Sequence, residues 1–295
     1  MTHKKSIIIT IFVAFIWSLS GLFVKKIDWN PLAIAGGRSA IAVLLMLPYM
    51  ARTKVKVSWY VLGGAVCYCL FNYCFTISTK LTTAAMAIMM QYTAPIYVVL
   101  LSWVVFKEKI KKGDAISIVF VIIGMVLFFS DQFGGGTMVG NLIAVCNGLT
   151  FAGISIFLRL QKNENPVLSM FFGNLISAIV GIPFMLTKPT PSTLGLSLVA
   201  INGACVALTY CLYAYASKGL TSLESVLIPI LDPLLNPVWV MLLAGEYPGL
   251  TSIIGSVIIL TSVTLNVLFE IHQESISERD REKCLTEDIT HTSKQ

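Results

Sequence analysis

Long apolar runs dominate the chain, and short polar stretches separate them at nearly regular intervals. A helix crosses a bilayer with about 20 mostly apolar residues. Lipid offers a backbone amide no hydrogen-bond partner outside its own helix, so strands and loops cannot span it singly. The pattern therefore predicts an all-α polytopic membrane protein with ten transmembrane helices. We expect them at residues 6–24, 31–50, 59–78, 83–105, 114–130, 139–160, 168–186, 195–217, 222–244 and 250–270.

Composition supports the same class. Hydrophobic residues make up 56% of the 295 positions and charged residues 12%, whereas a soluble protein carries roughly 25% charged residues. The first run has no small-residue cleavage site and further spans follow it, so we interpret it as a retained helix and not as a signal peptide. The polar stretch 271–295 is predicted to be a disordered cytoplasmic tail.

The distribution of Lys and Arg predicts the orientation of the chain. With the N-terminus inside, 16 of the 21 basic residues fall on the cytoplasmic side and four outside, while Arg38 lies within the second span. Cytoplasmic loops carry the excess of Lys and Arg in membrane proteins. We therefore expect both termini in the cytoplasm, and the short external loops favour a bacterial plasma membrane.

An internal repeat divides the chain. Lys80, Pro95 and Glu108 recur as Lys218, Pro233 and Glu246, each 138 residues after its counterpart. The first copy has five spans, so the second enters the membrane from the opposite side and the repeat is inverted. Inverted repeats around a central site are a frequent plan of secondary transporters. We expect one five-helix repeat at 1–130, a Gly-rich external link at 131–138 and a second repeat at 139–270.

Several short patterns resemble a known family. They are Asn30-Pro31 followed by Arg38, then Ala94-Pro95 through Glu108 with Gly124, and Asp232-Pro233 through Glu246 with Gly255. Together with the two inverted copies, they make residues 6–270 resemble the EamA-type branch of the drug/metabolite transporter superfamily. The resemblance implies a basket of ten helices around a central cavity, alternating access and no use of ATP. It also implies a broad substrate range, from amino acids, nucleosides and amines to drugs, often with export.

Ionisable side chains inside the membrane are costly and usually mark a function. Asp232 lies in the ninth span, with Glu224 and Asn236 on the same loose helical stripe. We interpret Asp232 and Glu224 as candidates for binding a cation or a coupling proton, although neighbouring helices could also hold Asp232 for packing alone. Arg38 could bind a carboxylate, but we favour a structural link, and we assign structural roles to Pro95, Glu108, Pro233 and Glu246 as well. Pro95 in the fourth span, and Pro229, Pro233 and Pro237 in the ninth, are expected to kink their helices. The kinks could expose carbonyl groups to a cavity or only shape the packing.

Polar and aromatic residues within other spans are candidates for lining the cavity, and each could equally be a packing residue. Aromatic faces attract organic cations. The predicted substrate-binding set is Trp17, Asn72, Tyr73, Gln91, Asn147, Tyr210, Asp232 and Asn236.

The candidate chemistry excludes several classes of function. None of the three His lies in a predicted span, and the seven Cys show no metal-ligand spacing, so we expect no metal, no cofactor and no enzyme. The scattered basic residues exclude nucleic acid. We predict a secondary transporter for a small metabolite, either proton-coupled or facilitative, and favour a cationic or zwitterionic amine or amino acid. A channel or facilitator for polar solutes, or a broad-specificity exporter, stays open, as does a homodimer. The expected partners are the substrate and the lipid bilayer.

Overall fold

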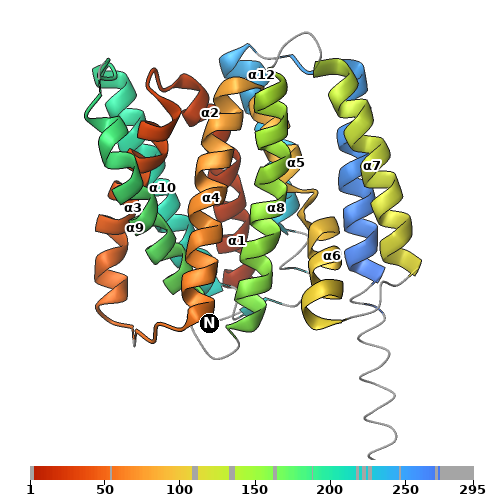
Figure 1. The fold of residues 1–295 in the computed structure, drawn as a ribbon, viewed down its shortest axis with the longest axis horizontal. Helices are drawn as coiled ribbons and strands as arrows, with labels where there is room; N and C mark the ends of the chain where they lie inside the picture. Colours follow the sequence, from red (N-terminus) through yellow and green to blue (C-terminus); the bar gives the residue numbers. More distant parts are fainter. Residues whose placement is uncertain are drawn as a thin grey trace, which may run out of the picture.

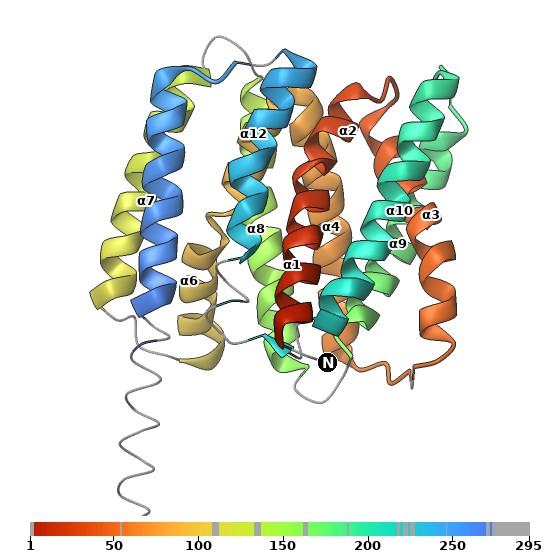
Figure 2. The ribbon, with the colours of Figure 1, turned by 180° about the vertical axis from the view of Figure 1, so that it is seen from behind.

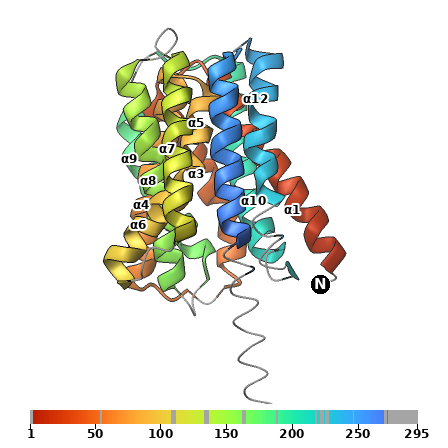
Figure 3. The same cartoon turned by 90° about the vertical axis from the view of Figure 1, so that its right-hand side faces the viewer.

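The computed structural model describes residues 3–53, 55–107, 112–132, 137–161, 165–187, 189–216, 219, 220, 224, 228–245, 247–269 and 272. Within these residues the regular structure is helical and contains no strand. Figure 1 shows the helices running roughly parallel between two levels, and Figure 3 shows the same arrangement from the side of α7. We call the level where α1 begins the lower end and the opposite level the upper end.

The helices follow one another up and down through the bundle. The last one carries no label in the figures and is the blue helix beside α7 in Figure 2. Their bounds are α1 His3–Ser18, α2 Ser20–Lys26, α3 Pro31–Met50, α4 Trp59–Leu81, α5 Ala84–Gln91, α6 Ala94–Phe106, α7 Lys112–Gln132, α8 Met138–Leu160, α9 Val167–Met185, α10 Thr193–Ala216, the 3-10 turn η2 Ile228–Ile230, α12 Leu231–Ala244 and the last helix Leu250–Phe269.

The described helices confirm a polytopic membrane protein. Eight of them, counted with α1–α2 and α5–α6 as single spans, are long and apolar enough to cross a bilayer. The other two predicted spans are helical but fall outside these eight: α7, and the shorter apolar helix Ile228–Ala244. One feature differs from the expectation, because the first span is interrupted at Leu19, between α1 and α2.

Short polar residues start several of the helices. Asn30 accepts a hydrogen bond from the amide of Leu32, and Pro31 occupies the first turn, where it needs no amide hydrogen. Ser58, Thr83 and Thr137 cap α4, α5 and α8 in the same way through their hydroxyl oxygens. These caps satisfy amides that lipid could not, so each of these four helices begins where the sequence supplies a cap.

Two spans are broken near their middle, both at prolines. The fourth span stops at Gln91 and restarts at Ala94, with Pro95 in the first turn of α6. The ninth passes from the turn η2 into α12, where Pro233 and Pro237 lie inside the helix. Proline has no amide to donate and crowds the preceding turn, so both breaks follow from the sequence, as predicted.

Small residues set the closest contact between helices. α3 packs extensively against α9, and a Cβ added at Gly36 would lie 2.6 Å from the Cα of Gly181. α4 packs against α8 and α9, α10 against α1 and α3, and α5 against α8 and α12. Gly124 of α7 similarly faces the backbone of Gly255 in the last helix.

Candidate functional site

Asp232 occupies the first turn of α12 and is only 5% exposed. The hydroxyl of Tyr92 lies 3.3 Å from Asp232 Oδ2 and 3.0 Å from the carbonyl oxygen of Pro229. The other carboxylate oxygen, Asp232 Oδ1, has no hydrogen-bond partner among the described residues. Tyr92 follows directly after α5, and Pro229 is part of η2. The two broken spans therefore meet at one phenol, and a buried carboxylate oxygen is left open there.

α12 also forms hydrogen bonds to the first span at its interruption. Asn236 Nδ2 donates to the carbonyl oxygen of Ser18 at 2.6 Å, and Trp239 Nε1 donates to the Ser18 hydroxyl at 2.9 Å. Ser18 is the last residue of α1, so these bonds satisfy groups freed by the interruption at Leu19. Asn236 Oδ1 is buried without a partner, like Asp232 Oδ1. One face of α12 thus carries two open acceptor oxygens.

Arg38 forms a second polar cluster nearer the upper end. Its Nε and Nη2 both donate to Asn72 Oδ1, the Nε bond at 2.9 Å, and its Nη1 lies 3.4 Å from the Ser20 hydroxyl. Asn72 in turn donates to the Ser39 hydroxyl at 2.9 Å. The guanidinium also lies 5.5 Å from the centre of the Phe75 ring. Arg38 therefore links α2, α3 and α4, and among the described residues it forms no ion pair with a carboxylate.

Aromatic rings from three helices lie together between these two clusters. We call Trp17, Tyr68, Tyr210 and Tyr213 the aromatic group. Trp17 lies 6.1 Å and 5.4 Å from Tyr210 and Tyr213, measured between ring centres, and Tyr68 lies 5.6 Å from Tyr210. Tyr210 lies within range of electrostatic interaction with both Arg38 and Asp232. The group thus occupies the space between the basic and the acidic cluster.

The structure brings only part of the predicted substrate-binding set together. Trp17, Tyr210, Asp232 and Asn236 surround this central region with Asn72 at its upper side, and Gln91 is the half-buried last residue of α5, next to Tyr92. Two other members lie at helix contacts. The Tyr73 hydroxyl donates to the carbonyl oxygen of Ser177 in α9 at 2.8 Å, and Asn147 Nδ2 donates to that of Ala87 in α5 at 3.0 Å.

Comparison with known proteins identifies the family. Residues 4–130 and 138–268 each match the model of the EamA-like transporter family. The chain belongs to the EamA-like transporter family. An uncharacterized transporter of Archaeoglobus fulgidus is 24% identical over 247 residues, which cover 83% of this chain and 89% of that protein. Human solute carrier family 35 member G1 is 25% identical over 187 residues, which cover 55% of this chain and about half, 50%, of the human protein.

One solved crystal structure shares the fold. It covers 92% of this chain and 99% of its own, with a TM-score of 0.61 and 17% sequence identity. The family match and the relatives named as transporters confirm that the EamA-like chain is an integral multi-pass membrane transporter and not an enzyme, as the sequence predicted.

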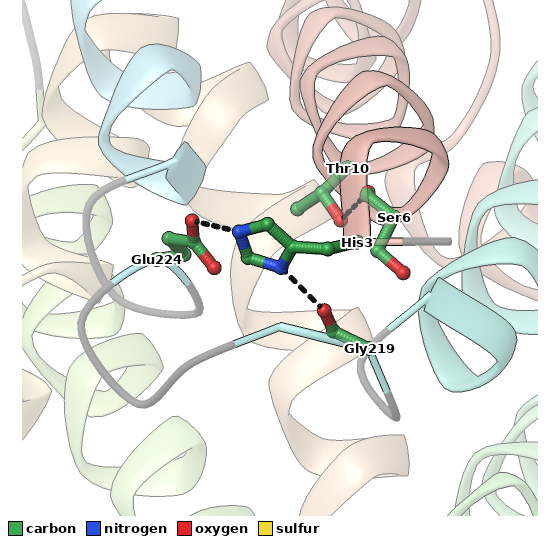
Figure 4. A network of polar contacts seen from close by, with 5 residues as sticks. All are labelled: His3, Ser6, Thr10, Gly219 and Glu224. Atoms are coloured by element: carbon green, nitrogen blue, oxygen red, sulfur yellow. Dashed lines mark hydrogen bonds and ion pairs between the residues drawn. The ribbon is translucent and has the colours of Figure 1, made fainter. Parts of the chain in front are cut away.

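Glu224, the second predicted coupling residue of this EamA-like transporter, lies apart from Asp232 at the lower end. Figure 4 shows its carboxylate facing the His3 ring, with His3 Nε2 at 3.0 Å from Glu224 Oε1 and His3 Nδ1 at 3.0 Å from the carbonyl oxygen of Gly219. The two side chains are 55% and 23% exposed. Exposed pairs of this kind contribute about 0–1 kcal/mol. The contact joins the start of α1 to the connection that follows α10.

Sequence reasoning missed two residues of the central region. Tyr92 and Tyr68 were not predicted, although Tyr92 lies three residues before Pro95, where the helix was expected to break. A phenol at a predicted break could have been a signal. Glu108 and Glu246, predicted as structural residues, lie outside the described residues.

Proposed function

We propose that this EamA-like transporter is a secondary carrier for a small cationic or zwitterionic amine or amino acid, with Asp232 as the cation- or proton-binding residue. One observation carries the proposal: two broken helices meet at Tyr92 and Asp232, and a buried carboxylate oxygen faces the meeting point without a partner. Discontinuous helices at mid-depth are where carriers bind substrates and coupling ions. A buried carboxylate costs free energy unless something charged or protic satisfies it.

The contacts between helices support two inverted halves. Each pair that joins the first half to the second has a counterpart with the roles exchanged: α4 with α8 and α10 with α1, α4 with α9 and α10 with α3, α5 with α8 and α12 with α1. The family model also matches once in each half. Such an arrangement favours alternating access, because two similar halves can exchange conformations around a shared site.

The Tyr92 hydroxyl supports a role for a proton. It has one hydrogen and two acceptors within reach, Asp232 Oδ2 and the carbonyl oxygen of Pro229. When Asp232 is ionised, that hydrogen satisfies the carboxylate. When Asp232 is protonated, its own hydrogen can go to the Tyr92 oxygen while Tyr92 donates to Pro229. In either protonation state a hydrogen bond thus joins Tyr92 to Asp232 Oδ2, which suits a residue that binds and releases protons.

The charges around the aromatic group favour the substrate class. An ammonium group would pair with Asp232 and face aromatic rings, which attract cations. Arg38 keeps unused guanidinium donors after its bonds to Asn72 and Ser20, and no carboxylate pairs with it among the described residues. A carboxylate on the substrate would face Arg38. An amine would need Asp232 only, whereas an amino acid would use both Asp232 and Arg38.

Burial favours a state that is closed at the upper end. Residues Ala84 to Met90 of α5 are all buried, and Lys25 donates to the carbonyl oxygens of Thr79 and Thr82 above the site. Ile228 to Ile230, on the lower side of Asp232, are only half-buried. The lower end also carries most basic residues of the described part, which agrees with a cytoplasmic location there and, we propose, in a bacterial plasma membrane.

The test is a binding screen followed by flux measurements on the full-length chain. Purified protein is heated with amines, amino acids and carboxylates of matched size, because a ligand that binds the folded state raises the unfolding temperature. A hit is then assayed in proteoliposomes for saturable uptake and for counterflow. We expect both for an amine or an amino acid. Non-saturable flux without counterflow would indicate a channel instead, and exclusive binding of carboxylates would contradict the assigned role of Asp232.

A further inference from the structure

A groove on the described part of the chain lies away from the central site. It runs between α7 and the last helix and has a volume of about 860 Å³, within the range of ligand pockets. The other faces of the same two helices pack into the bundle through Val121 and Ile259. Its walls are mostly apolar side chains, chiefly Ile116, Phe120, Val257, Ile258, Leu265 and Phe269.

We propose that this groove binds an anionic phospholipid, with one acyl chain along its length and the headgroup at Lys112. Several of the apolar lining residues are about half exposed or more, including Ile116 at 59%, Leu265 at 61% and Phe269 at 51%. One lining residue is basic instead of apolar. It is Lys112, the first residue of α7, and it is exposed at the lower mouth of the groove. Apolar walls with one basic residue at the mouth match the two parts of an anionic lipid.

The depth of the groove fits one leaflet. The lining residues of the last helix extend from Val257 to Phe269, which is roughly 18 Å at about 1.5 Å per residue. The hydrocarbon region of a bilayer is about 30 Å thick, so one leaflet contributes roughly 15 Å. An acyl chain that entered from the lower surface would therefore follow the groove to near the middle of the membrane.

The charge at the mouth favours an anionic headgroup. Lys112 is exposed among the lining residues at the lower end of the groove, and Lys107 is exposed at the end of α6. Among the described residues close to Lys112 in the sequence, the acidic one is Asp114. It is 5% exposed and accepts a hydrogen bond from Asn266 at 3.1 Å, so its charge is engaged between the two helices. Basic residues at the membrane surface attract anionic lipids with about 1 kcal/mol each.

The test compares two lipids that differ only in the headgroup. Dioleoyl phosphatidylglycerol and dioleoyl phosphatidylcholine are added to delipidated full-length protein, and bound lipid is counted by native mass spectrometry. About 1 kcal/mol from Lys112 corresponds to about fivefold in affinity, so phosphatidylglycerol should bind about fivefold more tightly. Lys112→Gln should remove that preference without weakening phosphatidylcholine, whereas Lys56→Gln, an exposed control elsewhere at the lower end, should keep it.

A second pair of variants tests the groove itself. Ile258→Trp fills the hollow and should weaken both lipids, whereas Val66→Trp, on the half-exposed face of α4, should weaken neither. Equal binding of the two lipids by the wild type would overturn the proposal. So would full competition by soluble glycerol phosphate, or a stable dimer that Ile258→Trp dissociates, since a second copy would then occupy the groove. If Ile258→Trp fails to fold, the exposed Lys112→Gln variant still decides, and no outcome depends on transport activity.

Discussion

The two broken spans, α5–α6 and η2–α12, share a shape and differ in chemistry. Pro95 and Pro233 occupy the same place in the repeat, but the residue before each proline is Ala94 in one copy and Asp232 in the other. Ala94 is an apolar residue that is 2% exposed, while Asp232 is an equally buried acid with an open oxygen. The proline thus accounts for the break, and its neighbour decides whether the break can bind a cation.

Burial separates the two breaks further. Ala84 to Met90 of α5, above the first break, are all buried, whereas η2 before the second break is half-buried. Tyr92 of the first span reaches across to Asp232 and Pro229 of the second. The first break therefore supplies a fixed phenol and the second supplies the carboxylate, so one site draws unequal parts from two similar elements.

The largest effect should come from removing the charge that distinguishes the copies. Asp232→Asn keeps the shape of the side chain but cannot pair with a cation, and losing a buried charged partner costs at least about 2–3 kcal/mol, or about 100-fold in affinity. Uptake of the identified substrate in proteoliposomes should fall accordingly. Asp28→Asn, an exposed acid outside the spans, serves as the control. Wild-type uptake by Asp232→Asn at all pH values would remove Asp232 from the mechanism.

Moving the acid to the other copy tests whether the two breaks are equivalent. Asp232→Ala alone should be inactive, and Ala94→Asp in that background should restore measurable uptake, because the acid would again lie beside the meeting point of the two spans. Uptake and unfolding temperature are measured together. A folded double variant with no uptake would mean that only the second copy can present the carboxylate.

The contact between the breaks is expected to have a smaller effect. Tyr92→Phe removes a hydroxyl that serves both Asp232 and Pro229, and a hydrogen bond to a charged group contributes about 1.5–3 kcal/mol, so uptake should fall about tenfold or more. Tyr73→Phe removes a hydroxyl that joins α4 to α9. This matched variant should lower the unfolding temperature and leave the substrate affinity unchanged. The reverse pattern would place the binding region near Tyr73.

The smallest effect should come from the contact that precedes the second break. His3→Ala breaks the exposed pair with Glu224, and such pairs contribute about 0–1 kcal/mol. The unfolding temperature and the uptake should both stay close to wild type. Loss of uptake at unchanged stability would show that the lower connection controls the second break.

The sequence predicted the features that depend on local pattern. The apolar runs predicted the spans, and the prolines predicted the breaks at Pro95 and Pro233. Because acidic residues are rare in membranes, Asp232 was predicted to be functional. It did not predict the interruption at Leu19, which has no proline at the break, although Ser20 and Gly21 follow it directly, and where Asn236 and Trp239 donate hydrogen bonds to Ser18. The helical face of Tyr73 was also ambiguous, because only the packing of α9 on α4 directs its hydroxyl to Ser177.

The Gly36–Gly181 contact has a mechanical consequence. At these two residues α3 and α9 approach each other backbone to backbone, because neither glycine places a side chain between them. A change in the angle between α3 and α9 would not require any side-chain rotamer to change at this point. A larger residue at either position would clash with the facing backbone and restrict that angle. We therefore expect the Gly36–Gly181 contact to serve as a pivot when the first repeat moves relative to the second.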